Sequence, residues 1–514
     1  MISITLDAKR SLTIEEVDAI SRREATLDIS NDPEFVTLIS DGADFLRDQF
    51  EREGAVYGVT TGYGDSVERA VPVDLVEELP LHLSRFHGCG LGEVLNIPQS
   101  RMVLAVRLSS LCRGYSGVSL ELLRRLELLL KNDILPVIPS EGSVGASGDL
   151  TPLSYVAAVL IGERDVWYKD ERKSTADVYA ELGISAYKMR PKEALAIMNG
   201  TSVMTALAVE AFMRGEYLSQ LTTRLTALTS LALKGNPHHF SKALFAAKPH
   251  PGQVKAAAWI RSDLVNVPSS FPEGRLQDRY STRCAPHIIG VLEDMLPVIR
   301  RMIEIEMNSA NDNPLIHDRQ ILHGGHFYGG HIAFAMDSLK NLVANLADLL
   351  DRQLAVLVDP KFNNGLPANL SGVQGRRSSI NHGLKAVQIG ASAWTAEALK
   401  HTMPASVFSR STESHNQDKV SMGTIAARDA LRVLQLSEQV AAAQIIATVQ
   451  ALRLRERQNE LSSDHYSHDV QQFLSQVACS VAFIEEDRPL DDCLRLLISQ
   501  IQLRQFSLYE EERK

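Results

Sequence analysis

Apolar side chains recur with the period of an α-helix over two long stretches of the chain. Between residues 331 and 358 they fall at i, i+3, i+4 and i+7, and the same spacing continues over residues 425–457. At 1.5 Å per residue, a helix of the second length spans roughly 45 Å. Such helices bury their apolar stripes against one another, and the partner helix can belong to another subunit. The pattern therefore predicts a helical bundle in an oligomeric protein.

The first part of the chain follows a different pattern. Up to about residue 200, short helical segments alternate with glycine-rich turns such as YGVTTGYGD, FHGCGLGE and SEGSVGASGD. We therefore predict a mostly α protein in two parts. A compact N-terminal region covers residues 1–198, and a long-helix bundle with C-terminal helices covers residues 199–514.

The composition is that of an ordinary soluble globular protein, with 45% apolar and 23% charged residues among 514. A formal net charge of −10 argues against nucleic acid or an anionic membrane surface as the main partner. The N-terminal stretch lacks the apolar core of a signal peptide, and no apolar run approaches the roughly 18 residues of a membrane span. We therefore expect a cytoplasmic protein that binds neither nucleic acid nor membranes.

Neither the cysteines nor the histidines are spaced as metal ligands. The five cysteines are scattered without a CxxC pair, and the histidine groups, such as His323, His326 and His331, lack HExxH spacing. We expect no metal site and no disulfide framework.

The stretch GSVGASGDLTPL, residues 142–153, could be a plain loop or a site of backbone chemistry. Thr151 followed by Pro152 predicts a helix start there. A tight turn at Ala146-Ser147-Gly148 would let the Gly148 nitrogen attack the Ala146 carbonyl carbon. Loss of two waters, one carrying the Ser147 hydroxyl, would leave the electrophile 4-methylideneimidazol-5-one (MIO). The triplet alone decides nothing, because chance supplies one in roughly one such chain in five.

The whole string GSVGASGDLTPL closely resembles the signature of the aromatic amino acid lyase family. This family comprises histidine, tyrosine and phenylalanine ammonia-lyases and related aminomutases. The resemblance runs through most of the chain, and its motifs are closest to those of bacterial tyrosine ammonia-lyases. It implies that Ala146-Ser147-Gly148 cyclises autocatalytically to MIO, without a metal. It also implies a homotetramer whose active sites draw residues from three chains.

The resemblance assigns roles to two tyrosines and an arginine. In VYGVTTGYGDS, Tyr57 corresponds to the catalytic tyrosine of a mobile loop, although a tyrosine in a turn is usually there for packing. To act as a base near neutral pH, Tyr57 needs a positive group or helix N-terminus that lowers its pKa. In LQDRYSTRCAPHIIG, Arg283 corresponds to the residue that binds the substrate carboxylate, where an isolated arginine would be read as a surface residue. Tyr280 and Gln277 are expected beside the reacting groups.

Two further motifs contribute to the expected site. In MNGTSVMTALAV, Asn199 at the entrance to a helix resembles the asparagine that contacts MIO and the substrate carboxylate. In LHGGHFYGGH, Phe327 corresponds to an active-site phenylalanine, but His326 replaces the usual asparagine. Tyr63 likewise stands where relatives commonly have phenylalanine. Pro314, in the DNP segment, is expected to end the preceding helix.

The ring pocket carries the information on the substrate. In LSRFHGCGLG, Phe86 and His87 occupy the two selectivity positions. Phe86 offers an aromatic face, and His87 can bond a phenolic hydroxyl or an imidazole N–H. An apolar substrate ring would leave a buried His87 unpaired, at a cost of about 1–3 kcal/mol. Gln417, in ESHNQDKVSMGT, stands where histidine lyases have a glutamate for the imidazole, although Asp418 could still approach the pocket.

These residues favour a tyrosine ammonia-lyase that converts L-tyrosine to trans-4-hydroxycinnamate, with L-DOPA as a second substrate. L-Histidine is the first alternative and L-phenylalanine the next. A 2,3-aminomutase would use the same residues. A catalytically silent helical-bundle protein is the alternative from a different class, but it would not need Ala146-Ser147-Gly148, Tyr57 or Arg283.

Overall fold

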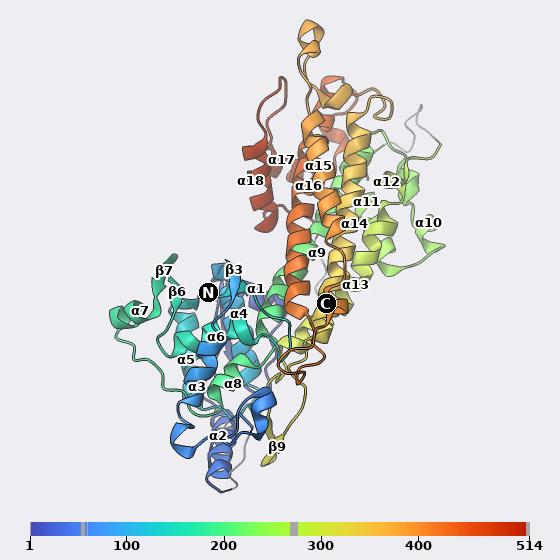
Figure 1. The fold of residues 1–514 in the computed structure, drawn as a ribbon. Coiled ribbons are helices and arrows are strands. Elements are labelled where there is room, and N and C mark those ends of the chain that lie inside the picture. The colour runs from blue at the N-terminus through green and yellow to red at the C-terminus, as the bar shows by residue number, and fades with distance from the viewer. Residues whose placement is uncertain (1, 53–56, 59, 268–275, 510–514) are drawn as a thin grey trace. The chain divides into compact units, whose positions relative to one another are not determined.

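The computed structural model describes residues 2–52, 57–58, 60–267 and 276–509. The chain is mostly helical, as predicted, and short strands are confined to small sheets (Figure 1). The long helices expected from the apolar period are confirmed as α14 (Gly330–Val358) and α16 (Gly423–Arg457). In the described part of the chain, no helix is both long and apolar enough to cross a membrane.

The chain divides into two compact units that alternate along the sequence. The first unit comprises Met1–Ala211, Arg300–Asp337 and Pro404–Arg428, and the second comprises Phe212–Ile299, Ser338–Met403 and Asp429–Lys514. This differs from the single boundary expected after residue 198. Four of the five boundaries fall within long helices, which are α9 (Ser202–Ala232), α13 (Ala285–Met307), α14 and α16, and the fifth follows α15, between Met403 and Pro404. α13 ends well before Pro314, so the expectation that this proline ends the helix is wrong.

The first unit contains short helices and every strand found among the described residues. They are β1 (Ile2–Leu6), α1 (Ile14–Ser21), β2 (Ala25–Ile29), α2 (Pro33–Arg52), α3 (Leu79–Phe86), β3 (Leu91–Val94), α4 (Ile97–Leu111), α5 (Leu120–Lys131), β4 (Leu135–Pro136), β5 (Pro139–Glu141), α6 (Leu150–Leu160), β6 (Asp165–Tyr168), β7 (Glu171–Ser174), α7 (Thr175–Leu182), α8 (Glu193–Met198), β8 (Leu315–His317) and β9 (Gln320–Leu322). The second unit adds the helices α10 (Lys242–Ala246), α11 (Pro251–Asp263), α12 (Tyr280–Arg283), α15 (Lys385–Lys400), α17 (His468–Ala478) and α18 (Asp491–Gln502).

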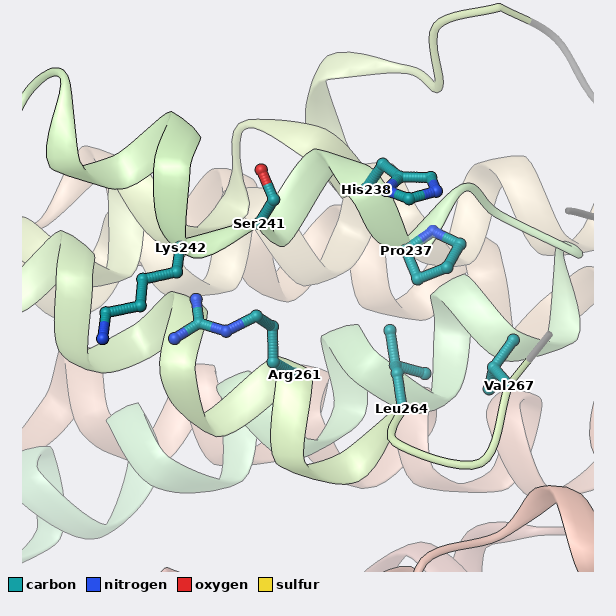
Figure 2. A pocket seen from close by; sticks show the side chains of 7 residues that line it. All are labelled: Pro237, His238, Ser241, Lys242, Arg261, Leu264 and Val267. Carbon is teal, nitrogen blue, oxygen red and sulfur yellow. The ribbon is translucent and has the colours of Figure 1, made fainter. Parts of the chain in front are cut away.

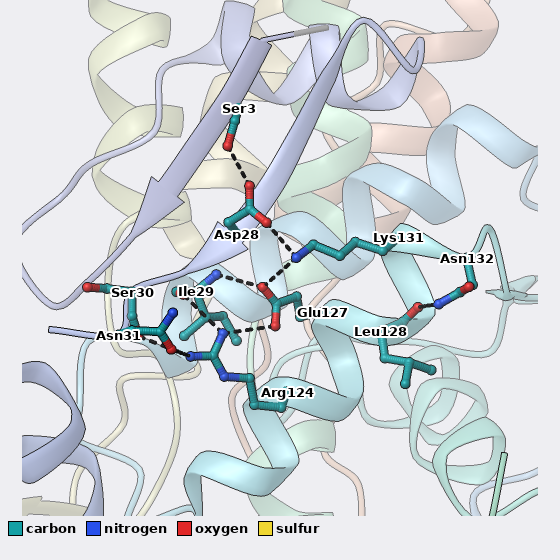
Figure 3. A network of polar contacts seen from close by, with 10 residues as sticks. All are labelled: Ser3, Asp28, Ile29, Ser30, Asn31, Arg124, Glu127, Leu128, Lys131 and Asn132. Atoms are coloured by element: carbon teal, nitrogen blue, oxygen red, sulfur yellow. Dashed lines mark hydrogen bonds and ion pairs between the residues drawn. The ribbon is translucent and has the colours of Figure 1, made fainter.

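A polar network joins the small N-terminal sheet to helix α5 (Figure 3). β1 and β2 pair in parallel. Glu127 on α5 accepts the Ile29 amide at 2.9 Å and pairs with Lys131 at 2.9 Å. Lys131 also pairs with Asp28 at 2.5 Å, and that carboxylate accepts the Ser3 hydroxyl. The leucines of α5 are buried at helical spacing beside Glu127, so the network fixes the amphipathic helix against the sheet.

The first turns of helix α9, residues 202–209, are buried on every side, and a half-buried stripe follows between residues 210 and 220. Val203, Leu207 and Phe212 are buried together with hydroxyl-bearing residues such as Thr222 and Thr226. A helix buried all round belongs to the core and leaves little room for movement. Its first turn is therefore a rigid support for whatever it contacts.

Candidate active site

The triplet Ala146-Ser147-Gly148 lies in the first unit between β5 and α6. Gly148 has φ = +73°, and a Cβ built on it would lie 2.1 Å from the Gly200 carbonyl oxygen. Two backbone hydrogen bonds hold this contact. The Gly200 N–H donates to the Ser147 carbonyl at 3.2 Å, and the Asp149 N–H donates to the Gly200 carbonyl at 2.7 Å. Conformation and space therefore both require glycine at position 148.

The Gly148 amide makes no hydrogen bond to any residue in the described part of the chain. The amides of Ala146 and Ser147 make none either, whereas those of Asp149 and Gly200 do. Ala146 and Ser147 are half-buried. A backbone nitrogen without a partner, in a turn held from outside, is available as a nucleophile. The residues present thus fit the ring closure in which this nitrogen attacks the Ala146 carbonyl carbon.

Asp149 connects the starts of three helices beside the triplet. Its buried carboxylate accepts the amides of Val203 at 3.0 Å and Met204 at 2.8 Å, in the first turn of α9. It also accepts the hydroxyls of Ser143, at 3.3 Å, and of Thr424, at the start of α16. Burial raises the pKa of Asp149 to about 6, and these hydrogen bonds act in the opposite direction. The start of α6 is thereby tied to the starts of α9 and α16.

The predicted start of α6 is wrong. The helix begins at Leu150 with Asp149 at the N-cap, so Thr151 and Pro152 both lie within the first turn. The Asp149 side chain makes no cap bond to α6, because its carboxylate is directed to the amides of α9. The turn at Gly148 brings the backbone into the helix two residues earlier than the Thr-Pro pair suggests.

The segment 412–422 lies along the triplet. The Gln417 side-chain amide donates to the Ser147 hydroxyl at 3.4 Å, and its oxygen accepts the Thr412 hydroxyl at 3.0 Å. Farther along the segment, the Met422 amide donates to the Val144 carbonyl at 3.0 Å. Gln417 is therefore positioned beside the triplet, with its amide nitrogen directed toward Ser147. Asp418, the next residue, is exposed.

Asn199 is 3% exposed and its side-chain oxygen has no hydrogen-bond partner. It follows the last turn of α8, where its amide donates to the Leu195 carbonyl at 2.8 Å. α9 begins only at Ser202, so Asn199 ends one helix rather than starting the next. A buried acceptor without a partner costs about 1–3 kcal/mol. The Asn199 side-chain oxygen is therefore positioned to accept a hydrogen bond from a bound group.

A buried polar chain supports the linker between α8 and α9. The Thr201 hydroxyl donates to Glu306 at 2.6 Å and accepts from the Asn311 amide at 2.7 Å. The Arg107 guanidinium donates to the Asn311 side-chain oxygen at 2.9 Å, and burial lowers the pKa of Arg107 to about 10. These bonds hold the backbone that carries Asn199 and Gly200.

Tyr57 lies in the first unit with its hydroxyl accepting the Gly64 amide at 3.0 Å. Its ring meets the His323 ring edge-on, with the ring centres 6.4 Å apart. Burial raises the pKa of Tyr57, the Glu413 carboxylate raises it further, and the Gly64 N–H acts in the opposite direction. The sequence analysis required a positive group that lowers this pKa. Within a single chain, the surroundings of Tyr57 raise it instead.

Glu413 was missed by the sequence reasoning. Its carboxylate accepts the Asp65 amide at 2.8 Å and the Asn416 side-chain amide at 2.9 Å. A Cβ on Gly64 would lie 2.3 Å from its oxygens. Glu413 therefore links the loop that carries Tyr57 to the turn that carries Gln417. The signal in the sequence was Glu413 itself, the carboxylate that begins the motif ESHNQD.

Phe86 and His87 lie at the end of α3. Phe86 is 61% exposed, and its ring centre is 4.2 Å from that of His87. The His87 Nδ1 lies 3.1 Å from the Leu83 carbonyl, which makes Nδ1 the protonated nitrogen of the neutral ring. Burial lowers the pKa of His87, and the nearby Arg164 lowers it further. His87 is thus neutral at pH 7, with Nε2 as a hydrogen-bond acceptor.

Phe327 is half-buried in the segment that precedes α14. The same segment packs on the start of α9, where a Cβ on Gly329 would lie 2.2 Å from the Met204 sulfur and 3.3 Å from the Thr201 methyl group. The segment also carries His323, which meets Tyr57. His326, which replaces the asparagine expected there, is exposed.

Gln277, Tyr280 and Arg283 belong to the second unit. Arg283 donates from Nε to the Asp278 carbonyl at 2.9 Å and from Nη2 to the Gln277 oxygen at 3.2 Å. Its guanidinium lies 4.7 Å from the centre of the Tyr280 ring, and Tyr280 is 72% exposed. The structure therefore brings these three predicted residues together as a separate group.

The predicted site residues thus form two groups. Tyr57, the triplet, Asn199 and Gln417 belong to the first unit, together with Phe86, His87 and Phe327. Across the described ranges, no cluster of three or more His, Cys, Asp or Glu side chains is arranged to hold a metal ion.

Comparisons with known proteins place these motifs in context. The sequence model of a family described as aromatic amino acid lyase matches residues 12–478. A histidine ammonia-lyase of Staphylococcus aureus is 35% identical over 462 residues, which are 88% of this chain and 90% of the relative. The solved structure of a tyrosine aminomutase from Streptomyces globisporus is similar with a TM-score of 0.90 at 32% identity, covering 98% of each chain. That of a histidine ammonia-lyase from Trypanosoma cruzi has a TM-score of 0.87 at 29% identity, covering 98% of this chain and 94% of that one.

Proposed function

The chain belongs to the aromatic amino acid lyase family and is a carbon–nitrogen lyase, and from this premise we propose that it deaminates L-tyrosine to trans-4-hydroxycinnamate. The observation that carries the proposal is the tautomer of His87. With Nδ1 directed to the Leu83 carbonyl, Nε2 is left to accept a hydrogen bond, and a phenolic hydroxyl is a donor of the required kind. L-DOPA presents the same donor.

We further propose that Ala146-Ser147-Gly148 matures to MIO, without a metal. The fit rests on the free Gly148 amide, on the space that excludes a side chain at this position, and on the unpartnered oxygen of Asn199. When formed, the group supplies an electrophile for the substrate amine.

Tyr57 is the proposed base for the β-proton. The Gly64 N–H stabilises the phenolate, whereas burial and Glu413 oppose it. Deprotonation of Tyr57 therefore requires a positive charge brought into the site. Arg283 is the proposed source, because it is also the residue proposed to bind the substrate carboxylate in a bidentate pair. Tyr280 and Gln277 accompany it.

We propose that Arg283 reaches the triplet of another chain, in a homotetramer whose active sites are shared. Two features support this. Tyr280 and Gln277 are exposed, as residues completed by a second chain would be. Arg283 binds only neutral oxygens and the Tyr280 ring among the described residues, so its charge is available to a carboxylate.

L-Histidine is the second candidate substrate. The relative from Staphylococcus aureus bears the name histidine ammonia-lyase, and an imidazole N–H could also donate to His87 Nε2. Against it stands the amide of Gln417 beside Ser147, which carries no negative charge for an imidazolium. L-Phenylalanine is disfavoured, because it would leave Nε2 of His87 unpaired at about 1–3 kcal/mol. The aminomutase alternative is supported by the likeness to the tyrosine aminomutase structure.

The test is to incubate the purified protein in parallel with L-tyrosine, L-DOPA, L-histidine and L-phenylalanine and to follow the absorbance of each unsaturated acid. We expect 4-hydroxycinnamate and caffeate to form with the highest kcat/KM. Dominant urocanate would overturn the tyrosine assignment. Chromatography for β-tyrosine in the same samples separates a lyase from an aminomutase, because a lyase releases one ammonia for each tyrosine consumed.

A further inference from the structure

A cavity of about 340 Å³ lies in the second unit, and none of the residues proposed for catalysis lines it (Figure 2). It is formed by the start of α10, the end of α11 and the short 3-10 turn that precedes α10. Its size is within the range of small-molecule sites. The lining residues are Pro237, His238, Ser241, Lys242, Arg261, Leu264 and Val267.

The cavity carries positive charge that no described carboxylate neutralises. Arg261 donates to the Phe240 carbonyl at 2.7 Å, and neither it nor Lys242 forms an ion pair within the described ranges. Burial lowers the pKa of Arg261. Asp263, two residues after Arg261 in α11, does not neutralise the cavity, because its carboxylate pairs with Arg224 at 3.0 Å.

The second nearby carboxylate is also engaged elsewhere. Asp278 accepts the Asn236 amide at 2.8 Å and lies 3.7 Å from His239. The two cations of the cavity therefore lack a local counter-ion. A site with a half-buried guanidinium and a free ammonium recognises an anion, and a carboxylate suits the planar guanidinium.

The cavity is polarised. Figure 2 shows Lys242 and Arg261 toward one end, and Pro237, Leu264 and Val267 toward the other, where His238 also lies. An inorganic anion would use only the basic end. A flat apolar body attached to the anion would in addition cover the apolar end, at about 25 cal/mol per Å² of surface removed from water.

We propose that this cavity binds an aromatic carboxylate that lacks an amino group. Its carboxylate pairs with Arg261 and Lys242, its ring lies against Leu264 and Val267, and a ring hydroxyl can reach His238. L-Tyrosine is disfavoured, because its ammonium group would be held beside two cations. The arylpropenoate product of the proposed lyase reaction belongs to this ligand class, and only that identification rests on the proposed function.

The test measures equilibrium binding of 4-hydroxycinnamate by calorimetry to the full chain carrying Arg283→Met, which weakens binding at the proposed active site. Lys242→Met is added to remove one cation of the cavity, and Lys248→Met, an exposed lysine outside the lining, serves as the matched control. We expect Lys242→Met to weaken the remaining site about tenfold or more, as for loss of a charge-assisted hydrogen bond, and Lys248→Met to leave it unchanged. Arg261→Met is expected to act in the same direction.

Three further probes define the ligand. 4-Vinylphenol lacks the carboxylate, L-tyrosine adds the ammonium group, and inorganic phosphate lacks the apolar body, so each is expected to bind at least about tenfold more weakly. Equal binding of phosphate, or unchanged affinity in Lys242→Met, would overturn the proposal. Because these measurements need no turnover, they remain decisive even if the chain proves to act on another amino acid.

Discussion

The triplet and the segment around Arg283 are built in opposite ways. Around Gly148, every neighbouring element is fixed: the turn is paired with Gly200, and Asp149 holds the first turns of two other helices. Around Arg283, the guanidinium contacts the Gln277 side chain, the Tyr280 ring and the Asp278 carbonyl, and Tyr280 is 72% exposed. One region is a rigid support for chemistry within a single chain. The other is an exposed group of side chains of the kind that recognise a carboxylate.

The difference bears on how an active site can be divided between chains. Backbone chemistry at the triplet requires a rigid turn, and rigidity comes from burial and hydrogen bonds within one chain. Recognition of a carboxylate requires only a charged side chain at the right place, which another chain can deliver at its surface. We therefore infer that the first unit carries the triplet and the second unit carries the groups that recognise the substrate carboxylate.

The strongest test of this division mixes two inactive variants. Ser147→Ala lacks the hydroxyl that MIO formation expels, and we expect kcat to fall about 10⁴-fold or more. Arg283→Met removes the proposed carboxylate partner, and we expect kcat/KM to fall about 10²- to 10³-fold. If the two chains are unfolded and refolded together, some sites will combine an intact triplet with an intact Arg283. Activity above the sum of the parents is the expected result.

Refolding each variant alone gives the control, because it shows how much activity the procedure itself restores. A mixture no more active than the parents, at proven co-assembly, would mean that each site takes Ser147 and Arg283 from the same chain. Intact mass supplies a second check: the wild-type chain should be lighter than its sequence by two waters, and Ser147→Ala should not show this loss.

The next test contrasts the two regions in stability. Gly148→Ala places a Cβ 2.1 Å from the Gly200 carbonyl oxygen at a positive φ, so we expect the free energy of unfolding to fall by about 3 kcal/mol or more. Tyr280→Ala truncates an exposed ring, and we expect a change within about 0.5 kcal/mol together with a loss of kcat. Thermal unfolding of both variants measures the contrast. Similar losses of stability would contradict it.

The sequence predicted the parts of the molecule that depend on periodicity and on local motifs. The apolar period located α14 and α16, and the resemblance located the Gln417 segment, whose contact with Ser147 spans much of the chain. It misplaced the start of α6, because the Asp149 carboxylate bonds a distant helix, and a residue string does not show such a partner. The raised pKa of Tyr57 depends on burial and on Glu413, which is equally remote in sequence.

A smaller effect is expected within the ring pocket. His87→Leu removes the acceptor at Nε2, so we expect kcat/KM for L-tyrosine to fall about 10- to 100-fold while that for L-phenylalanine is unchanged or rises. His82→Leu, on the same helix but exposed, is the matched control and should leave the ratio of the two substrates unaltered. An equal loss for both substrates would indicate that His87 supports α3 and does not contact the ring.

The smallest effect concerns the proton. Glu413 raises the pKa of Tyr57, so Glu413→Gln should lower that pKa and move the rising limb of kcat/KM toward lower pH. Glutamine keeps an oxygen for the Asp65 amide, so the loop stays attached while the charge is lost. Glu413 is exposed and screened by water, which limits the shift to less than about one pH unit. Glu68→Gln, an exposed carboxylate on the same loop, should not move the limb. If the rising limb of kcat/KM stays in place in Glu413→Gln, or moves to higher pH, Tyr57 is not the group whose ionisation limits the reaction. Another residue near the triplet would then have to act as the base.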